Sequence, residues 1–218
     1  MLLSPRDEST GEGLSEQEVR DQCMVIFQAG HETTATALLW WSRLLAADPH
    51  ALAAAQREVD AVLQGAAPGA DDVARLPWLT ATLKEAMRLY PPIPALMSRR
   101  TTRDIRLGGW TLPEGALVRL TPWVIQRDER HFEQPMRFMP QRFIDPSAKG
   151  PRGAWLSFGT GPRVCIGQHF AMLEMTLIAA MLLQRYDLQL PEDAPPCEPL
   201  MHVTLRPKSG VTLVLRRR

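Results

Sequence analysis

Cysteine is scarce in this chain of 218 residues, no apolar run is long, and neither sign of charge dominates. The three cysteines, Cys23, Cys165 and Cys197, are too few for the disulfide framework of a small secreted protein. A serine, a proline and two charged residues at positions 4–7 interrupt the apolar start, so no secretory signal peptide is predicted. These absences favour the reducing cytoplasm as the location.

The balance of charge excludes two classes of partner. The 25 basic and 24 acidic residues give a formal net charge of +1, which provides no general attraction to nucleic acid or to an anionic membrane. The apolar stretch 24–45 contains His31, Glu32 and Arg43, so no transmembrane segment is predicted. With 45% hydrophobic and 22% charged residues, the composition is that of an ordinary globular protein.

Residues 6–48 contain no proline, and this gap predicts one long helix over residues 15–47 after a loop over residues 1–14. Ser15 and Glu18 form a capping-box pattern at its start. Its apolar residues lie nearly all round the helix, which is typical of a helix that runs through a protein core. These residues are Met24, Val25, Ile26, Phe27, Leu38, Leu39, Trp40, Trp41, Leu44 and Leu45.

Shorter elements follow the long helix. Asp48 and Pro49 open a second helix that runs to about residue 63. Apolar residues three and four positions apart predict a third helix over residues 78–90, which Pro91 stops. The other predicted segments are a small antiparallel sheet over 105–120, an irregular stretch over 123–165, a helix over 166–185 and a terminal β region over 186–218. The expected fold class is mainly α with small antiparallel β-sheets.

Two motifs with well-understood chemistry are incomplete. Residues 31–32 begin like the HExxH of zinc proteases, but Ala35 stands where the second histidine is needed. Residues 159–161 begin like a dinucleotide-binding loop, but Val164 stands at the third glycine position and no parallel strand–helix unit surrounds the loop. Zinc hydrolysis and dinucleotide binding are therefore not predicted.

Cys165 lies in a glycine-rich segment, FGTGPRVCIG over residues 158–167, which we name the cysteine loop. Backbone N–H groups at a helix start stabilise an anion, so the predicted helix after the loop favours a thiolate at Cys165. A single thiolate serves as a nucleophile or as an axial ligand of iron. An inert cysteine beside a turn is a third interpretation, and spacing alone leaves all three open.

The cysteine loop, with Phe158, Gly161, Arg163, Cys165 and Gly167 at the pattern positions, resembles the iron-ligand loop of the cytochrome P-450 family, the haem-thiolate monooxygenases. Three further segments occur in the order of that family: Ala29-Gly30-His31-Glu32-Thr33-Thr34, Glu85-x-x-Arg88, and Phe138-x-Pro140-x-Arg142-Phe143. The resemblance covers nearly the whole chain. It implies that residues 1–218 form a single partial domain, similar to the C-terminal half of the family fold.

The resemblance implies haem b, iron protoporphyrin IX, as the cofactor, with Cys165 as the ligand of its iron. Phe158 is then expected to pack over the thiolate, and Arg163 and Arg99 to pair with haem propionates. Glycines let the backbone approach the porphyrin and the sulfur. The glycines expected to do so in the cysteine loop are Gly159, Gly161 and Gly167.

On the long helix, the resemblance implies that Glu32 and Thr33 relay protons to dioxygen. It also implies that the helix widens beside the haem at Gly30, where a glycine costs about 1 kcal/mol relative to alanine. His31 is expected to be packed or hydrogen-bonded and not to be a ligand. The residues expected to face a small apolar substrate are Phe27, Ala29, Ala95, Leu96 and Val203.

Periodicity and resemblance disagree about Glu85 and Arg88. At 100° per residue the pair lies opposite the apolar face of its helix, which predicts a surface ion pair worth about 0.3–0.5 kcal/mol. The resemblance instead implies a buried network with Arg142 that holds the cysteine loop behind the haem.

An electron donor such as a ferredoxin or flavodoxin system is the expected protein partner. Between positions 137 and 163 the local net charge is +4, which suits an acidic donor, although a solvated face is the alternative. The residues counted are Arg137, Arg142, Lys149, Arg152 and Arg163 against Asp145.

The expected activity is insertion of one oxygen atom of dioxygen into an apolar organic compound. One alternative keeps the haem but is an isomerase or a peroxide-using enzyme, and Glu32 and Thr33 count against it. The other is a truncated, non-catalytic fragment. In a fragment, Leu38, Trp40 and Trp41 are expected to be partly uncovered, and exposed apolar patches of more than a few hundred Å² are unusual in soluble monomers.

Overall fold

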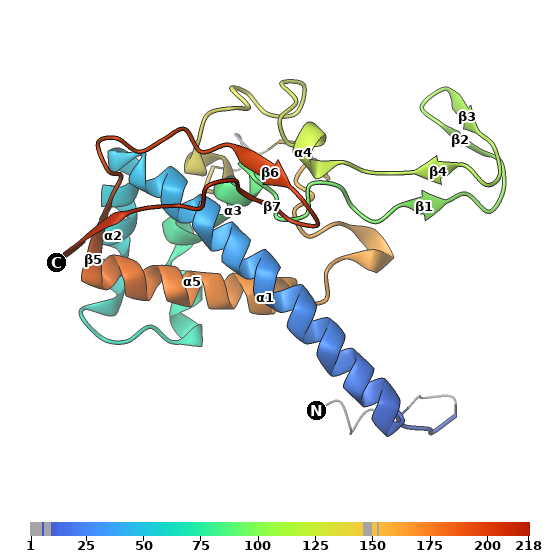
Figure 1. The fold of residues 1–218 in the computed structure, drawn as a ribbon, viewed down its shortest axis with the longest axis horizontal. Helices are drawn as coiled ribbons and strands as arrows, with labels where there is room; N and C mark the ends of the chain where they lie inside the picture. Colours follow the sequence, from blue (N-terminus) through green and yellow to red (C-terminus); the bar gives the residue numbers. More distant parts are fainter. Residues whose placement is uncertain (1–5, 7–9, 146–149, 152) are drawn as a thin grey trace.

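The computed structural model describes residues 6, 10–145, 150–151 and 153–218, and α-helices dominate this part of the chain (Figure 1). The α-helices are α1 (Glu16–Ala46), α2 (Pro49–Leu63), α3 (Pro77–Leu89), α4 (Pro122–Ile125) and α5 (Gln168–Arg185). Short 3-10 turns lie at Ala70–Arg75, Pro140–Phe143 and Gly161–Arg163.

The described strands form antiparallel pairs. The pairs are β1 (Arg99–Arg100) with β4 (Leu117–Val118), β2 (Ile105–Leu107) with β3 (Trp110–Leu112), β5 (Tyr186–Gln189) with β8 (Val214–Arg217), and β6 (Pro199–Met201) with β7 (Leu205–Pro207). The expected single sheet over 105–120 is thus a β2–β3 hairpin beyond a separate β1–β4 pair (Figure 1). The fold class, mainly α with small antiparallel sheets, is confirmed.

The three long N-terminal helices begin in different ways. The Ser15 hydroxyl accepts from the backbone N–H of Glu18 at 3.3 Å, and the Glu18 carboxylate accepts from the backbone N–H of Ser15 at 2.8 Å, so the capping box is present. Asp48 caps α2. Helix α3 has no cap from its own N-cap residue.

The start of α3 is held by a residue of α2 instead. The Glu58 carboxylate accepts from the backbone N–H groups of Trp78 and Leu79, both at 2.8 Å. These N–H groups have no partner inside the helix, so the carboxylate satisfies both. Burial raises the pKa of Glu58, and the two hydrogen bonds act in the opposite direction.

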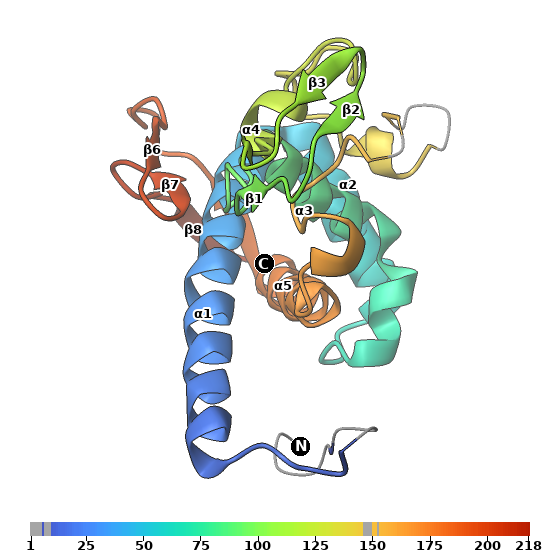
Figure 2. The ribbon, with the colours of Figure 1, turned by 90° about the vertical axis from the view of Figure 1, so that its right-hand side faces the viewer.

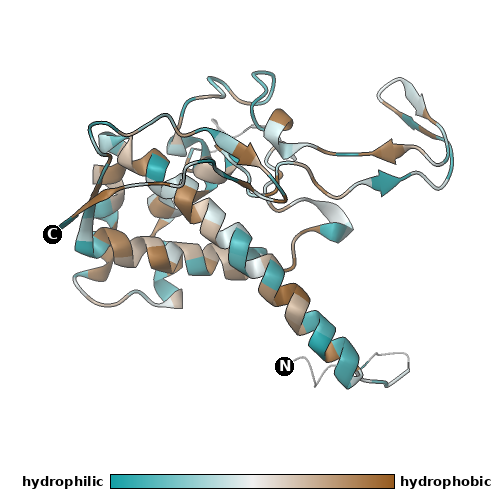
Figure 3. Cartoon of the chain, in the orientation of Figure 1, coloured by the Kyte–Doolittle hydropathy of each residue, from teal (hydrophilic) through white to brown (hydrophobic). Residues whose placement is uncertain are grey.

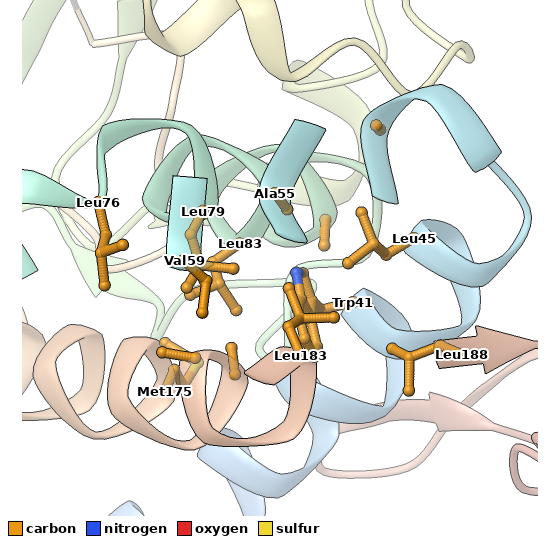
Figure 4. Packing of buried hydrophobic residues seen from close by; sticks show 14 of the residues in the cluster. Trp41, Leu45, Ala55, Val59, Leu76, Leu79, Leu83, Met175, Leu183 and Leu188 are labelled. Atoms are coloured by element: carbon orange, nitrogen blue, oxygen red, sulfur yellow. The ribbon is translucent and has the colours of Figure 1, made fainter. Parts of the chain in front are cut away.

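The hydrophobic core lies among the C-terminal half of α1 and helices α2, α3 and α5 (Figure 4). Trp41 and Leu183 are fully buried there, and burying a large side chain contributes roughly 1.5–3 kcal/mol. The indole N–H groups also have partners: Trp41 donates to the Thr82 hydroxyl at 2.9 Å, and Trp40 donates to the carbonyl of Leu205 at 2.7 Å. These two hydrogen bonds fix α1 to α3 and to β7.

The N-terminal half of α1 extends away from this core (Figure 2). Its apolar residues Met24, Val25, Ile26 and Phe27 are 55–72% exposed, and apolar stretches alternate with polar ones along it (Figure 3). The expectation of a helix buried along its length is wrong for this half, because α2, α3, α5 and β7 enclose only its second half. Among the described residues, none of the helices combines the length and the apolar character that crossing a bilayer requires.

Leu38 is half-buried, as expected, but the expectation that Trp40 and Trp41 are partly uncovered is wrong. Both side chains are only 1% exposed. Trp40 stacks on Tyr90 with ring centroids 3.7 Å apart, and β7 covers it from the other direction through Leu205. The exposed apolar surface of α1 is therefore mainly that of its first half, with Leu39 as an exposed apolar residue in the second half.

Candidate functional site

The cysteine loop is a series of closed turns between the irregular stretch and α5. The backbone N–H of Gly159 donates to the carbonyl of Leu156 at 2.8 Å, and that of Cys165 donates to the carbonyl of Phe158 at 2.9 Å. Cys165 itself is exposed and lies three residues before the first residue of α5. The loop thus presents one thiol at its surface on a backbone fixed by hydrogen bonds.

Two glycines of the loop are required by its backbone conformation. Gly159 and Gly161 have φ angles of +74° and +70°, a region that residues with a Cβ rarely adopt. Gly167 differs, because its backbone is ordinary, but a Cβ placed on it lies 3.9 Å from the sulfur of Cys165. The backbone of Gly167 is therefore close to the thiol.

Aromatic packing anchors the base of the loop. The half-buried ring of Phe158 meets that of Trp155 edge-on at a centroid distance of 5.8 Å, and Trp155 meets Phe143 in the same way at 5.8 Å. The Trp155 indole donates to the carbonyl of Lys84 on α3 at 3.3 Å. The loop is thereby packed against α3.

Glu85, Arg88 and Arg142 lie together in a buried ion network. Arg88 donates to both carboxylate oxygens of Glu85, at 2.7 and 2.8 Å, and Arg142 donates to Glu85 Oε1 at 3.4 Å. The Glu85 and Arg88 side chains are fully buried, so the surface ion pair predicted from periodicity is wrong. The physical reason is that the irregular stretch 126–142 covers the polar face of α3.

Backbone groups of that stretch complete the network. Arg88 donates to the carbonyls of Gln126 at 2.6 Å, Pro135 at 2.8 Å and Arg137 at 3.2 Å, and Glu85 accepts from the N–H of Met139 at 2.9 Å. Burial lowers the pKa of Arg142, while the Glu85 carboxylate opposes this effect. The network holds the irregular stretch onto α3 by hydrogen bonds that involve charged groups, which are stronger than neutral ones.

The predicted proton-relay residues have other partners. The Thr33 hydroxyl donates to the carbonyl of Ala29 at 2.7 Å, a bond back along the helix that favours bending. The Glu32 carboxylate accepts from the hydroxyl of Thr204 at 2.6 Å. Thr204, in the turn between β6 and β7, was missed by sequence reasoning because it lies 172 positions from Glu32 and belongs to no motif. Gly30 is exposed, with open space beside it.

The residues predicted to face the substrate differ in their solvent exposure. Phe27, Ala29 and Val203 are exposed, whereas Ala95 and Leu96 are half-buried. A methyl of Leu96 lies 3.9 Å from a Cβ built on Gly159, so Leu96 is beside the cysteine loop. Two hollows in the described part of the chain lie elsewhere, one of about 40 Å³ at Arg43 and Cys197 and one of about 180 Å³ at Phe132 and Phe143.

The remaining predicted residues lie at the surface. His31 stacks on Phe27 with ring centroids 6.0 Å apart. Arg99 is exposed, and its guanidinium donates to the backbone carbonyl of Met97. Arg163 is also exposed. Of the basic residues expected to attract an electron donor, Arg137 and Arg163 are exposed and Arg142 is buried, so Arg142 adds little to the surface charge. Lys149 and Arg152 lie outside the described residues.

The metal-ligating side chains available at this site fit a haem. No group of three or more His, Cys, Asp or Glu side chains suited to holding a metal ion occurs among the described residues, and Cys165 is a candidate for a single ligand. A haem iron needs only such an axial ligand, because the porphyrin supplies the others. Ile166, which follows Cys165 in sequence, and Phe170 in the first turn of α5 are exposed and apolar, which suits a flat apolar group. The exposed guanidinium of Arg163 suits a carboxylate.

Comparisons with known proteins identify the family of this chain. The family model "Cytochrome P450" matches residues 1–214. Cyclooctatin synthase of Streptomyces melanosporofaciens is 41% identical over 213 residues, which cover 97% of this chain and 44% of that protein. The putative cytochrome P450 132 of Mycobacterium bovis is 38% identical, covering 93% of this chain and 43% of that protein.

A plant relative is matched over similar shares of the two chains. The 11-oxo-beta-amyrin 30-oxidase of Glycyrrhiza uralensis is 35% identical over 97% of this chain and 40% of its own length. The chain thus spans about two fifths of the length of these curated relatives. With a family match over nearly every residue and a cysteine loop, ion network and helix motif in the expected order, the chain belongs to the cytochrome P450 family.

Proposed function

We propose that this chain carries the haem-binding half of a monooxygenase that inserts one oxygen atom of dioxygen into a small apolar organic compound. The observation that carries the proposal is the exposed Cys165 thiol on a loop closed by backbone hydrogen bonds and backed by the buried network of Glu85, Arg88 and Arg142. Haem b, when bound, supplies the oxygen chemistry, and the protein supplies the ligand, the orientation and the electrostatics.

Six residues of the cysteine loop have definite roles in this proposal. Cys165 binds the iron, and the ring of Phe158 limits access of water to the sulfur. Gly159 and Gly161 form the turns that bring the thiol to the surface of the loop, and the backbone of Gly167 lies close enough to influence the sulfur. Arg163 and Arg99 hold the haem carboxylates through their guanidinium groups.

Glu32 and Thr33, which lie beside Gly30 on the continuous α-helix Glu16–Ala46, hold the protons that the reaction consumes. The contact between Glu32 and Thr204 supports this role, because it fixes an otherwise exposed carboxylate to the β6–β7 turn beside Val203. An apolar substrate is bounded by Phe27, Ala29, Ala95, Leu96 and Val203.

The electron donor is a ferredoxin or flavodoxin system that docks near the exposed Arg137. Long-range attraction between such charged surfaces mainly raises the association rate and is weakened by salt. A cytoplasmic location stays a prediction from the small number of cysteines.

A reduced carbon monoxide difference spectrum of the 218-residue chain, taken after haem reconstitution, tests the proposal. Thiolate ligation is expected to give a red-shifted Soret band, which ligation by any of the five histidines does not give. Haem titration in the same preparation gives the stoichiometry. A spectrum of the imidazole type, or no saturable haem binding, contradicts the proposal and favours the non-catalytic alternative.

Thr33→Ala is expected to leave haem binding and the carbon monoxide spectrum intact and to divert electrons from product to hydrogen peroxide. The reason is that the substitution removes a hydroxyl beside the oxygen site without touching Cys165. Measurement requires an active preparation with its electron donor, in which hydrogen peroxide and product are counted per electron consumed. Thr33→Ser, which keeps the hydroxyl, is the control. Unchanged coupling in Thr33→Ala means that Thr33 only shapes the helix through its bond to Ala29.

A further inference from the structure

Gln126 lies between α3 and the cysteine loop, and its side chain is fully buried. Its Nε2 donates to the carbonyl of Met87 at 3.3 Å and to that of Arg88 at 3.0 Å. Its Oε1 accepts from the backbone N–H of Leu156 at 2.6 Å and from the hydroxyl of Ser157 at 3.2 Å. Both polar atoms are therefore satisfied, and the two ends of the carboxamide hold different parts of the chain.

The donor end holds the C-terminus of α3. The carbonyls in the last turn of a helix have no N–H partner within the helix, and a buried carbonyl left without a partner is unfavourable. Met87 and Arg88 belong to the last turn of α3, which ends at Leu89. The Met87 carbonyl also accepts from the Ser157 hydroxyl at 3.1 Å, so the loop segment meets this same turn.

The acceptor end holds the entry to the cysteine loop. Leu156 is buried, and its carbonyl accepts from the N–H of Gly159, which begins the turn. The carbonyl of Phe158 then accepts from the N–H of Cys165. Ser157, which Gln126 holds, therefore directly precedes Phe158, whose carbonyl is bonded to Cys165.

Gln126 is also part of the ion network, because the Arg88 guanidinium donates to its backbone carbonyl at 2.6 Å. Arg88 thus contacts Gln126 through its side chain and through its own carbonyl. The residue links the network of Glu85, Arg88 and Arg142 to the cysteine loop by direct hydrogen bonds.

We propose that Gln126 is a positioning residue that fixes the cysteine loop, and with it Cys165, against α3. The position needs a neutral side chain that donates at one end and accepts at the other, which a carboxamide does and an aliphatic side chain of similar size does not. This role follows from contacts within the chain itself. Its consequence for iron ligation rests on the proposed function.

The test compares Gln126→Leu with Val59→Ala in the 218-residue chain. Val59 is buried on α2, which packs on α3 and α5, so its truncation lowers overall stability from another part of the core. Amide hydrogen exchange is measured over residues 154–168 and over α2 and α5. Gln126→Leu is expected to accelerate exchange in the loop about tenfold or more relative to the helices. Val59→Ala is expected to accelerate exchange in the loop no more than in the helices.

Gln126→Asn provides a second variant if Gln126→Leu does not fold. It keeps both polar ends on a side chain too short to reach α3 and the loop together, so it is expected to loosen the loop selectively as well. Loop exchange that is unchanged, or accelerated only in proportion to the helices, overturns the positioning role in either variant.

The same variants, loaded with haem, separate this proposal from the proposed function. A Cys165-dependent carbon monoxide band together with unaffected loop exchange refutes the role of Gln126 and leaves the proposed function in place. Selective loosening of the loop in a chain that never shows such a band supports the role of Gln126 and refutes the proposed function.

Discussion

Cys165→Ala is expected to abolish the red-shifted carbon monoxide band of the haem-reconstituted chain. The loop offers no second ligand, because residues 158–167 contain one cysteine and neither histidine nor acid. An alanine there leaves the turns of the loop intact, since the backbone N–H of residue 165 still donates to Phe158. The effect is therefore on ligation and not on folding, and far-ultraviolet circular dichroism of the variant is expected to match that of the parent.

The other two cysteines provide matched controls for this experiment. Cys23 lies on the exposed half of α1, and Cys197 lies beside Arg43, where burial raises the pKa of its thiol. Cys23→Ala and Cys197→Ala are expected to keep the band in position and intensity. A band that survives Cys165→Ala, or that disappears in either control, removes the assignment of Cys165 as the iron ligand.

Arg88→Ala is expected to lower the free energy of unfolding by about 3–5 kcal/mol, because it leaves the Glu85 carboxylate buried without its main partner. Typical domains are stable by about 5–15 kcal/mol in total, so the loss is a large fraction of what holds the fold. Chemical denaturation followed by circular dichroism measures the change. The same variant is expected to bind haem poorly, since the irregular stretch and the cysteine loop lose a common anchor.

Arg75→Ala is the matched control for Arg88→Ala. Arg75 pairs with Asp72 at the same i, i+3 spacing and at a similar distance of 3.1 Å, but its side chain is 60% exposed. Pairs of this kind contribute about 0–1 kcal/mol. If the two variants lower the free energy of unfolding by similar amounts, burial of the Glu85–Arg88 pair does not increase its contribution to stability. The network is then not a structural anchor.

Local patterns predicted the long helices α1, α2, α3 and α5, because capping and periodicity involve residues a few positions apart, but they missed the short helix α4 within the stretch expected to be irregular. Ser15 with Glu18 and Asp48 with Pro49 are examples, and the expected fold class followed from them. The environment of a helix face is different. The burial of Glu85 depends on chain some 50 residues further on, and only the family resemblance predicted it.

No sequence pattern predicted several contacts of the candidate site. Thr204 reaches Glu32 across 172 positions, and Gln126 is one polar residue in an irregular stretch. The burial of Trp40 likewise requires β7, which no pattern in the helix indicates. Such contacts arise from tertiary packing. A sequence motif therefore identifies the residues that carry the chemistry more readily than the residues that support them.

The cap that Glu58 provides makes the start of α3 depend on α2. Starting a helix is costly, because several residues must be fixed before the first hydrogen bond forms. Helix α3 has no local cap to offset that cost, and it receives one only when α2 has docked alongside it. The N-terminus of the helix that carries Glu85 and Arg88 is therefore capped only where α2 packs beside it, so a change at Glu58 on α2 acts on α3.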